Sequence, residues 1–544
     1  MPDIRMDPYR KRYVNVMIPM RDGVRLGCDI YMPGGDGPFP AILIRTPYQK
    51  SPAVSPRYEE WGYYFADHSF AYIVQDVRGK GDSEGEFYPF LQEATDGYDS
   101  VEWIAAQDWC DGNVGTEGNS YLAFVQYLTL KANPPHLRAM AVSGSPGDLM
   151  RHGMAYLNGI KCLYMASWCM YTNGRASAQP ADRYLGPDPY DHLSPQQRVS
   201  ALPLSSILPQ KGFSSQYWDE TLTHELNDDF YSPARFFDST SDEHNVACLH
   251  VTGYFDIHVL ALIDYYEQML RSSAKEDQYL ICGPWPHECL VNPEATTGPF
   301  TFDNGVMDIK AQKVDFFTRY LKGDASVQIP KVRQYDMNTR RWHTSERMEN
   351  SREYLLYPAG GRLLTEGGSG TATHYEYNPM DPSLAFQWAC PYDATAYAAS
   401  RDDILTYVYE AQETITLDGR AVAELCVATD GIDTDFLCYV TCEVEGRQLP
   451  LAFGGQRLMM REALDRKVAA IPGEEMLLRI RMDYLYLTLH RGQKLMLHVT
   501  SSAFPMYARN LNTGEAVAGA VEFRTAKNSI IENKSRLILK VARG

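Results

Sequence analysis

The chain has 544 residues, of which 44% are hydrophobic and 22% are charged, a composition typical of globular proteins with large cores. Its 51 Lys and Arg residues against 69 Asp and Glu residues give a formal net charge of −18. This acidic balance argues against nucleic acid and anionic membrane surfaces as partners, because both bind clusters of Lys and Arg. We interpret the charge as a source of solubility.

Targeting and redox signals point to a cytoplasmic protein. No apolar run reaches the length of about 18 residues that a membrane span needs, and residues 1–5 contain no apolar signal core. The eleven cysteines are odd in number, form no C-x-x-C motif, and in several cases lie in apolar strand-like runs such as 425–427. This pattern favours reduced, buried thiols over a disulfide framework.

The first 145 residues alternate between strand-like and helix-like segments. Short continuous apolar runs at 41–44, 71–74 and 139–142 are typical of buried parallel strands. Segments 96–107 and 121–130 have helical spacing, and the second is apolar on nearly all sides. The alternation over 1–145 predicts the first part of a doubly wound sheet, the α/β-hydrolase class of fold.

Later segments follow other patterns. Residues 146–240 are rich in Met, Tyr, Trp and Pro, which predicts an inserted, mostly helical cap. The α/β pattern resumes over 241–350, with strand-like runs at 246–252 and 279–281. From 351 to 544 hydrophobicity alternates with period two, and Gly, Asp and Asn punctuate the strands, which predicts a C-terminal β-sandwich of jelly-roll type.

Residues 118–123 (GNSYLA) join a strand-like region to a helix. Small residues flank Ser120, as a nucleophile elbow requires, because that turn holds the backbone in a strained conformation. The turn would expose the Ser120 hydroxyl and place the Tyr121 backbone N–H at a helix N-terminus, where an oxyanion is stabilised. A Gly-x-Ser motif is a weak signal on its own, because an ordinary Ser N-cap also precedes a helix.

A serine nucleophile needs a base, and the base needs an orienting acid. Asp256 follows the strand-like run 246–252 and His287 follows 279–281, so both lie just past strand carboxyl ends. Ser, acid, His is also the chain order of α/β-hydrolases. His258 is a rival base, but it shares a loop with Asp256 and a structural role is favoured for it.

Eight motifs follow one another along the chain: RTPY at 45–48, QDVRGKGDSEG at 75–85, DGYDSVEWI at 96–104, GNSY at 118–121, GYFD at 253–256, GPWPH at 283–287, SSAFP at 501–505 and NLNTG at 510–514. In this order they resemble the cocaine esterase-like hydrolases of the X-Pro dipeptidyl-peptidase superfamily, over nearly the whole chain. Several ordered motifs are far more specific than any one of them.

The resemblance implies an α/β-hydrolase core, a helical cap and a C-terminal jelly roll, in agreement with the division above. It implies Ser120 as nucleophile, His287 as base and Asp256 as orienting acid. It also implies that the Tyr48 hydroxyl and the Tyr121 N–H form the oxyanion hole. Tyr48 follows the buried run 41–44, in the loop where hydrolases supply the second donor, and a phenol is a suitable donor toward developing negative charge.

Aromatic residues of the expected cap, among them Tyr156, Tyr164 and Trp168, would shape an apolar or aryl acyl pocket. Each of them, taken alone, fits a packed cap core equally well. The chemistry needs no metal or organic cofactor, and the histidines show no H-E-x-x-H spacing.

Two positions depart from the family pattern. Tyr254 stands where the family usually has Trp, and Glu117 stands where it usually has an apolar or aromatic residue. If Glu117 is buried, it needs a partner, and we expect it either to pair with an Arg or Lys or to reach the pocket and bind a substrate amine. The third alternative is that Glu117 lies in solvent. In the 75–85 motif we expect Asp76 and Arg78 to pair across a glycine-rich structural loop.

These features predict a serine hydrolase that cleaves a small-molecule ester or amide through a Ser120 acyl-enzyme. A hydrolase of X-Pro peptides or α-amino-acid esters is one alternative, which needs an acidic subsite with Glu117 and Glu288 as candidates. An acyltransferase or cyclase would use the same triad. A non-catalytic binding protein on this scaffold is disfavoured by the intact Ser, Asp and His, and the formation of a homo-oligomer is left open.

Overall fold

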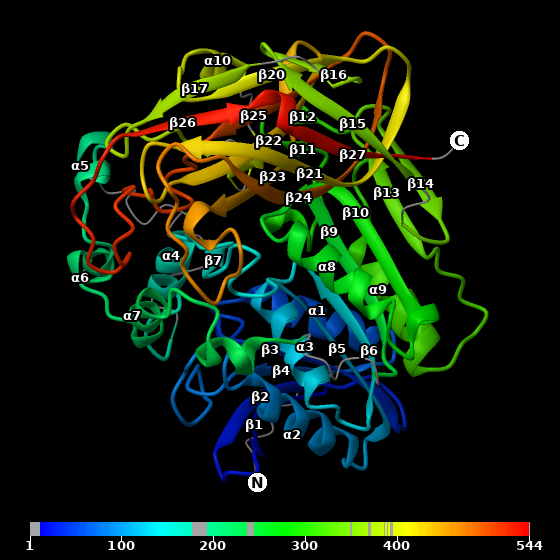
Figure 1. The fold of residues 1–544 in the computed structure, drawn as a ribbon. Coiled ribbons are helices and arrows are strands. Elements are labelled where there is room, and N and C mark those ends of the chain that lie inside the picture. Colours follow the sequence, from blue (N-terminus) through cyan, green and yellow to red (C-terminus); the bar gives the residue numbers. More distant parts are fainter. Residues whose placement is uncertain are drawn as a thin grey trace.

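The computed structural model describes residues 11–176, 193–236, 244–348, 351–367, 371–385, 387–388, 390–391 and 395–542. The domain boundaries expected near 240 and 350 lie outside the described residues. In Figure 1 a strand-rich C-terminal part lies above an α/β part that contains the N-terminus.

A ten-stranded sheet forms the α/β part. Its strands lie in the order β1 (Arg12–Pro19), β2 (Arg25–Tyr31), β4 (Ala71–Asp76), β3 (Phe39–Thr46), β5 (Cys110–Asn119), β6 (Leu137–Ser143), β9 (Ala247–Phe255), β10 (Gln278–Pro286), β13 (Val332–Asp336) and β14 (Arg341–Ser345). Neighbours from β4 to β13 pair in parallel, whereas the β1–β2, β2–β4 and β13–β14 pairs are antiparallel. Every residue of β4, β9 and β10 is buried, as in a sheet covered on both faces.

Five helices pack with this sheet: α1 (Pro56–Asp67), α2 (Glu93–Ala105), α3 (Tyr121–Lys131), α8 (Val259–Met269) and α9 (Ile309–Leu321). The predicted helices at 96–107 and 121–130 correspond to α2 and α3. All residues of α3 except Lys131 are buried, as its apolar sequence on nearly all sides predicts.

The strand order reverses at β3, because the chain adds β4 on one side of it and β5 on the other. Open α/β sheets bind ligands in the crevice at such a reversal, beyond the carboxyl ends of the strands. The loops that follow β3 and β5 are therefore the place where this fold is expected to hold a site.

Between β6 and β9 the chain leaves the sheet and forms short elements, which lie at the left of Figure 1: β7 (Tyr156–Leu157), β8 (Ile160–Lys161), α4 (Tyr164–Tyr171), α5 (Pro195–Ser200), α6 (Ile207–Gln210) and α7 (Gln216–Thr223). The sequence predicts a mostly helical cap here, but Tyr156 lies in the β7–β8 hairpin. The reason is an Asn-Gly turn, in which Asn158 and Gly159 both have positive φ (45° and 90°) and so favour a tight hairpin.

The C-terminal part is rich in strands. They lie in the order β17 (Ala372–Tyr377), β26 (Ala526–Ile531), β21 (Ile415–Thr429), β27 (Arg536–Ala542), β15 (Ser351–Ala359), β16 (Arg362–Leu364), β20 (Leu405–Glu410), β25 (Lys494–Thr500), β22 (Asp435–Val444) and β23 (Arg447–Arg457), with β24 (Met476–Leu489) beside β21. Over residues 477–482 of β24 exposed and buried side chains alternate, as the period-two pattern predicts. Minor elements are β11 (Thr296–Thr297), β12 (Phe300–Thr301), β18 (Gln387–Trp388), β19 (Cys390–Pro391) and α10 (Thr395–Ala399).

A buried ionic cluster links the parts of the chain. Asp264 on α8 contacts His152 at 3.0 Å, Arg420 on β21 at 2.5 Å and Arg481 on β24 at 2.9 Å. A carboxylate shared by three cationic or polar partners is well compensated for its burial. The C-terminal strands are thereby fixed to the helix that follows Asp256.

The glycine-rich loop after β4 differs from the expectation that Asp76 pairs with Arg78. Arg78 instead pairs with Asp22 at 2.8 Å and Asp96 at 2.6 Å. The loop folds back at Gly81, where φ is +47° and a Cβ would lie 2.0 Å from Asp76 Oδ2. Asp76 is therefore enclosed by the loop and accepts the N–H of Asp82 within it and that of Lys50 in the loop after β3.

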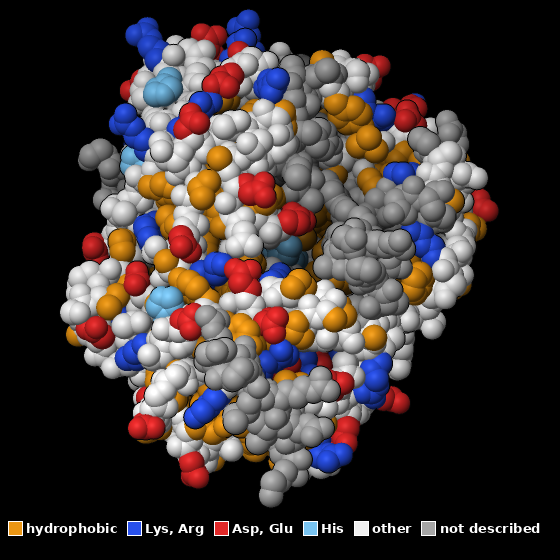
Figure 2. All heavy atoms as spheres, turned by 180° about the vertical axis from the view of Figure 1, so that it is seen from behind, with side chains coloured by type: hydrophobic (Ala, Val, Ile, Leu, Met, Phe, Trp, Pro, Cys, Tyr) orange, Lys and Arg blue, Asp and Glu red, His pale blue; other side chains and the backbone are white. Residues whose placement is uncertain are grey.

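Charges are mixed on the surface, and most of the thiols are buried. In Figure 2 basic and acidic side chains are interspersed over the face that is shown. Within the described part of the chain, no helix has the length and apolar character to cross a membrane. Ten described cysteines are thiols, of which Cys289 is half-buried and the others are buried.

Candidate active site

Ser120 forms a sharp turn between β5 and α3. Its backbone has φ 60° and ψ −127°, which is strained for a residue with a side chain. The turn is fixed by three hydrogen bonds: the Ser120 N–H donates to the Ser143 carbonyl at 2.9 Å, and the Ser120 carbonyl accepts from Ala123 and Phe124. Ser120 is half-buried, so its hydroxyl stands on a rigid support without being sealed in the core.

Gly118 is required by this turn. A Cβ at Gly118 would lie 2.5 Å from Leu122 Cβ, in the first turn of α3. Strand and helix therefore approach closely only because position 118 lacks a side chain, which is the role that small residues have in a nucleophile elbow.

Asp256 and His287 are in direct contact. Each follows its strand immediately, Asp256 after β9 and His287 after β10. His287 Nδ1 lies 2.8 Å from Asp256 Oδ1, and the Asp256 carboxylate also accepts from the Thr252 hydroxyl and the His258 N–H, each at 3.0 Å. The Asp256 side chain has no exposed surface and that of His287 is 11% exposed. This geometry holds His287 in one tautomer and leaves Nε2 as its reactive nitrogen.

The loop after β6 lies between the elbow and this pair. Ser143 accepts the Ser120 N–H, and a Cβ on the next residue, Gly144, would lie 2.7 Å from Asp256 Oδ2 and 3.2 Å from His287 Nδ1. The elbow and the Asp–His pair are thus next to consecutive residues of one loop. Ser120, Asp256 and His287 each follow a strand at the same edge of the sheet.

The pKa shifts of His287 and Asp256 are those expected of a base and its orienting acid. Burial lowers the pKa of His287, but the charge of Asp256 and its hydrogen bond outweigh this effect and raise the pKa above its ordinary value. Burial raises the pKa of Asp256, but His287 outweighs it and lowers that pKa. Asp256 is therefore ionised at neutral pH and stabilises a protonated His287.

His258, the rival base, has a different environment. Burial and the neighbouring His287 lower its pKa to about 3, so the ring is neutral at physiological pH. Its ring meets that of His287 edge-on, with centroids 5.0 Å apart. His258 contributes its backbone N–H to Asp256 and its ring to the packing around His287, in agreement with a structural role.

Tyr48 lies in the loop after β3 and contacts the inserted segment. Its N–H donates to Thr46 Oγ1 at 3.0 Å, and its hydroxyl accepts from Trp168 Nε1 at 3.0 Å. An indole that donates to the phenol oxygen orients the hydroxyl so that its own hydrogen points elsewhere. Trp168, expected from the sequence in the acyl pocket, is thus a direct contact of Tyr48.

The Tyr121 side chain is held in the core by several contacts. Its hydroxyl donates to Glu93 at 2.6 Å and accepts from the Phe90 N–H at 3.2 Å, and its ring stacks on Trp168 with centroids 5.4 Å apart. As the first residue of α3, Tyr121 has no carbonyl within the helix to receive its own N–H. That N–H is therefore suited to an oxyanion beside Ser120.

The other aromatic candidates are buried in the inserted segment. The Tyr156 hydroxyl donates to the Thr221 carbonyl at 2.7 Å, and its exposed fraction is 0%. Tyr164 begins α4 and is 9% exposed. The Trp168 side chain is hydrogen-bonded to Tyr48, a residue of the expected site.

Glu117, the residue that departs from the family pattern, is fully buried on β5. Its carboxylate accepts from Lys313 Nζ on α9 at 2.8 Å and from the Tyr72 hydroxyl. Both side chains of the Lys313–Glu117 ion pair are 1% exposed. Burial and the Glu117 charge raise the pKa of Tyr72 well above its ordinary value, so its hydroxyl stays protonated and donates. Of the three roles expected for Glu117, the structure shows pairing with a Lys.

Breaking this pair should destabilise the protein strongly. In Glu117→Gln the charge of Lys313 stays buried without a counter-charge, and we expect the free energy of unfolding to fall by about 3–5 kcal/mol. Glu60→Gln is the matched control, because Glu60 pairs with Lys310 one turn earlier on α9 but is 63% exposed; it should cost less than about 1 kcal/mol. Urea unfolding followed by tryptophan fluorescence measures both, and equal losses would contradict the prediction.

Glu288, the second candidate for an amine subsite, follows His287 directly but is exposed. No ion pair or hydrogen bond connects its side chain to the described residues of the site. In the described chain, no group of three His, Cys, Asp or Glu side chains has the geometry of a metal site.

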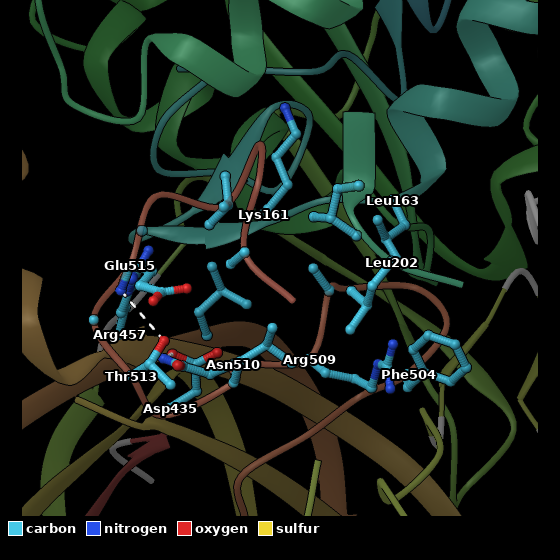
Figure 3. Close-up of a pocket in the computed structure, with 18 residues that line it drawn as sticks. Lys161, Leu163, Leu202, Asp435, Arg457, Phe504, Arg509, Asn510, Thr513 and Glu515 are labelled. Carbon is cyan, nitrogen blue, oxygen red and sulfur yellow. Dashed lines mark hydrogen bonds between the residues drawn. The ribbon is translucent and has the colours of Figure 1, made fainter. Parts of the chain in front are cut away.

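A hollow of about 570 Å³ lies away from Ser120, between the β8 region and the loops that follow β25. Figure 3 shows Arg509 and Asn510 on its wall, while the amino group of Lys161 points away from it. Lys161 donates to Thr221 Oγ1 at 2.7 Å, and Asn510 is hydrogen-bonded to Asp435 at 2.8 Å. None of the expected catalytic residues lines this hollow, and we do not assign it to the catalytic site.

Comparisons with known proteins agree with this geometry. Residues 22–288 match the X-Pro dipeptidyl-peptidase (S15 family) model, and residues 326–536 match the X-Pro dipeptidyl-peptidase C-terminal non-catalytic domain. The chain is 30% identical to a cocaine esterase of Rhodococcus sp. (strain MB1 Bresler), with 97% of this chain and 98% of that protein covered.

Two solved structures have similar folds over nearly their full length. An aminopeptidase from the marine sediment archaeon Thaumarchaeota archaeon has a TM-score of 0.86 at 23% identity, covering 98% of this chain and 97% of that one. An α-amino acid ester hydrolase also has a TM-score of 0.86, at 22% identity, covering 99% of this chain and 98% of that one.

The elbow, the Asp–His pair and these similarities define a class. The chain belongs to the cocaine esterase-like hydrolases of the X-Pro dipeptidyl-peptidase superfamily, with an α/β-hydrolase-type core and a strand-rich C-terminal domain. It is a serine hydrolase that acts on esters or amides.

Proposed function

We propose that the protein is a carboxylesterase or acylase in which Ser120, His287 and Asp256 form the catalytic triad. His287 takes the Ser120 proton as the hydroxyl oxygen attacks the substrate carbonyl, and Asp256 stabilises the imidazolium that forms. The alcohol or amine leaves with a proton from His287. Water then cleaves the acyl-enzyme by the same route and regenerates Ser120. The contact of 2.8 Å between His287 and Asp256, at strand ends next to the strained Ser120 turn, carries this proposal.

Two donors would hold the oxyanion. The Tyr121 N–H lies at the start of α3, where the helix dipole favours negative charge. The Tyr48 hydroxyl would be the second donor, with Trp168 fixing its orientation through the hydrogen bond of 3.0 Å. Preorganised donors of this kind stabilise the transition state without reorganising during the reaction.

The remaining parts would shape and support the site. Residues 146–240 would form a cap whose aromatic side chains enclose the acyl group, and the contact of Trp168 with Tyr48 supports this role. Residues 1–145 and 241–350 would make the hydrolase domain, and 351–544 a jelly roll. The described thiols agree with a cytoplasmic location.

Two other activities remain to be separated from ester or amide hydrolysis. An acyltransferase or cyclase would share every catalytic residue and differ only in the acceptor. A hydrolase of α-amino-acid esters, as one structural neighbour is named, would need a carboxylate for the substrate amine. Glu117 is paired with Lys313, and Glu288 is exposed. Both observations disfavour these two acids as the carboxylate that binds the amine.

A fluorophosphonate probe tests the proposal directly. The intact protein should be labelled once, and peptide mass spectrometry should place the label on Ser120, because such probes need a nucleophile with a neighbouring base. Labelling should be lost in the Ser120→Ala variant. A label on another serine, or none on folded protein, would overturn the proposed triad.

A further inference from the structure

A second hollow, which is partly open to solvent, lies directly beside the elbow. Gly118 and Asn119, the two residues before Ser120, form part of its wall, and Val291 closes it from the loop after His287. The rest of the wall combines three aromatic, three charged and one aliphatic side chain: Tyr58, Trp61, Tyr72, Arg57, Glu117, Lys313 and Ile44. A group bound here would therefore be part of a substrate attached to Ser120.

The charge of this hollow is positive. Among the described residues that line it, Arg57 and Lys313 are cationic and Glu117 is anionic. Lys313 and Glu117 compensate each other at 2.8 Å, and Tyr72 donates a further hydrogen bond to Glu117. The charge left over is that of Arg57, in a protein whose net charge is −18.

Arg57 has no carboxylate partner in the described chain. Its guanidinium lies over the Tyr58 ring, 5.1 Å from the centroid, and Nη2 lies 3.4 Å from the Tyr58 hydroxyl. Arg57 is exposed, and it lines the hollow from the start of α1. The guanidinium is therefore accessible to a group that binds beside the elbow.

Arg57 lies close to the reacting centre. It lines the same hollow as Gly118 and Asn119, the two residues before Ser120. Tyr58, Trp61 and Tyr72 line the hollow as well, so aromatic rings surround this cation.

We propose that Arg57 binds a carboxylate of the substrate, so that the enzyme prefers esters or amides with an anionic group close to the scissile bond. A guanidinium can donate two parallel hydrogen bonds to a carboxylate, which gives the contact a defined geometry. This inference rests on the proposed function, because it assumes that Ser120 is the nucleophile. The inference predicts a preference for anionic substrates, whereas an enzyme that recognises a substrate amine prefers cationic ones.

Matched pairs of esters test the inference. On the acyl side, the mono-p-nitrophenyl ester of adipic acid is compared with p-nitrophenyl hexanoate, which has the same chain length and no carboxylate. On the leaving-group side, p-acetoxybenzoate is compared with p-tolyl acetate. The quantity measured is the ratio of kcat/KM for the anionic ester to that for its neutral partner.

In Arg57→Gln this ratio should fall by about 10- to 100-fold for at least one pair, as expected for a lost charge-assisted hydrogen bond. Arg57→Lys should keep part of the preference, because it keeps the charge and loses the bidentate geometry. Lys310→Gln is the control for general charge, since Lys310 pairs with Glu60 at the surface of α9; it should change the ratio by less than about twofold.

Two failures can be distinguished. If wild type cleaves the neutral esters through a labelled Ser120, and the ratios in Arg57→Gln equal those of wild type in both pairs, the carboxylate site is wrong while the hydrolase stands. The same conclusion follows if Lys310→Gln lowers the ratio as much as Arg57→Gln does. If Ser120 is not labelled in folded protein, the proposed function fails and the carboxylate site fails with it.

Discussion

Replacing Ser120 by Ala should lower kcat for p-nitrophenyl acetate by about a millionfold, since removing the nucleophile of a serine hydrolase eliminates the covalent route. The backbone of the turn is held by hydrogen bonds of the Ser120 N–H and carbonyl, which Ala can also make. The variant should therefore fold and unfold like wild type. Steady-state rates at saturating ester, corrected for spontaneous hydrolysis, measure the effect.

Ser145→Ala is a matched control, because Ser145 is a buried serine in the loop after the neighbouring strand β6 and donates only to the Pro146 carbonyl. Its turnover should stay close to that of wild type. Retention of more than about 1% of wild-type kcat by Ser120→Ala would mean that another group attacks the ester.

Asp256→Asn should lower kcat by about four orders of magnitude while leaving the fold intact, because the amide favours the wrong tautomer of the imidazole. The amide introduced by this substitution can donate to His287 Nδ1, which places the ring proton on Nε2. That nitrogen then cannot accept the Ser120 proton. Ester turnover by the purified variant, with its far-UV circular dichroism as a check on the fold, measures the loss.

The pH dependence of kcat/KM is a second test of the role of Asp256. His287 acts as a base only when neutral, so kcat/KM in wild type should fall as the pH drops through its pKa, which Asp256 raises above the ordinary value of about 6.5. In Asp256→Asn the lowering effect of burial remains without the opposing charge. The acid limb should therefore move to lower pH, and an unmoved limb would contradict the assigned role of Asp256.

Much of the site could be predicted from sequence because its elements are local. The turn at Ser120 and the positions of Asp256 and His287 after buried strands are each encoded within a few residues. A parallel sheet brings the carboxyl ends of its strands to one edge, so placing each residue after its strand was enough to group all three. The β7–β8 hairpin was missed although its Asn-Gly turn was a usable signal, because the surrounding aromatic residues favoured a helix.

Partners that are distant in the chain could not be predicted. Nothing near Glu117 indicates that Lys313, 196 residues later, neutralises it, and nothing near Tyr48 indicates its hydrogen bond with Trp168, 120 residues later. Arg78 pairs with Asp22 and Asp96 rather than with the nearby Asp76, because the loop folds Asp76 inward. Arg57 belongs to no motif, and an exposed Arg in the first turn of a helix usually contacts only solvent, so its place beside the elbow could not be predicted.

The buried ion pair between Glu117 and Lys313 also affects the order in which β5 and α9 pack during synthesis of the chain. During translation the elbow leaves the ribosome long before α9, and until Lys313 arrives the Glu117 charge has no counter-ion in the core. We therefore expect β5, the strand that ends at Asn119, to reach its final packing only after α9 has been made and docked. On this expectation the turn at Ser120 is completed late in the folding of the α/β part.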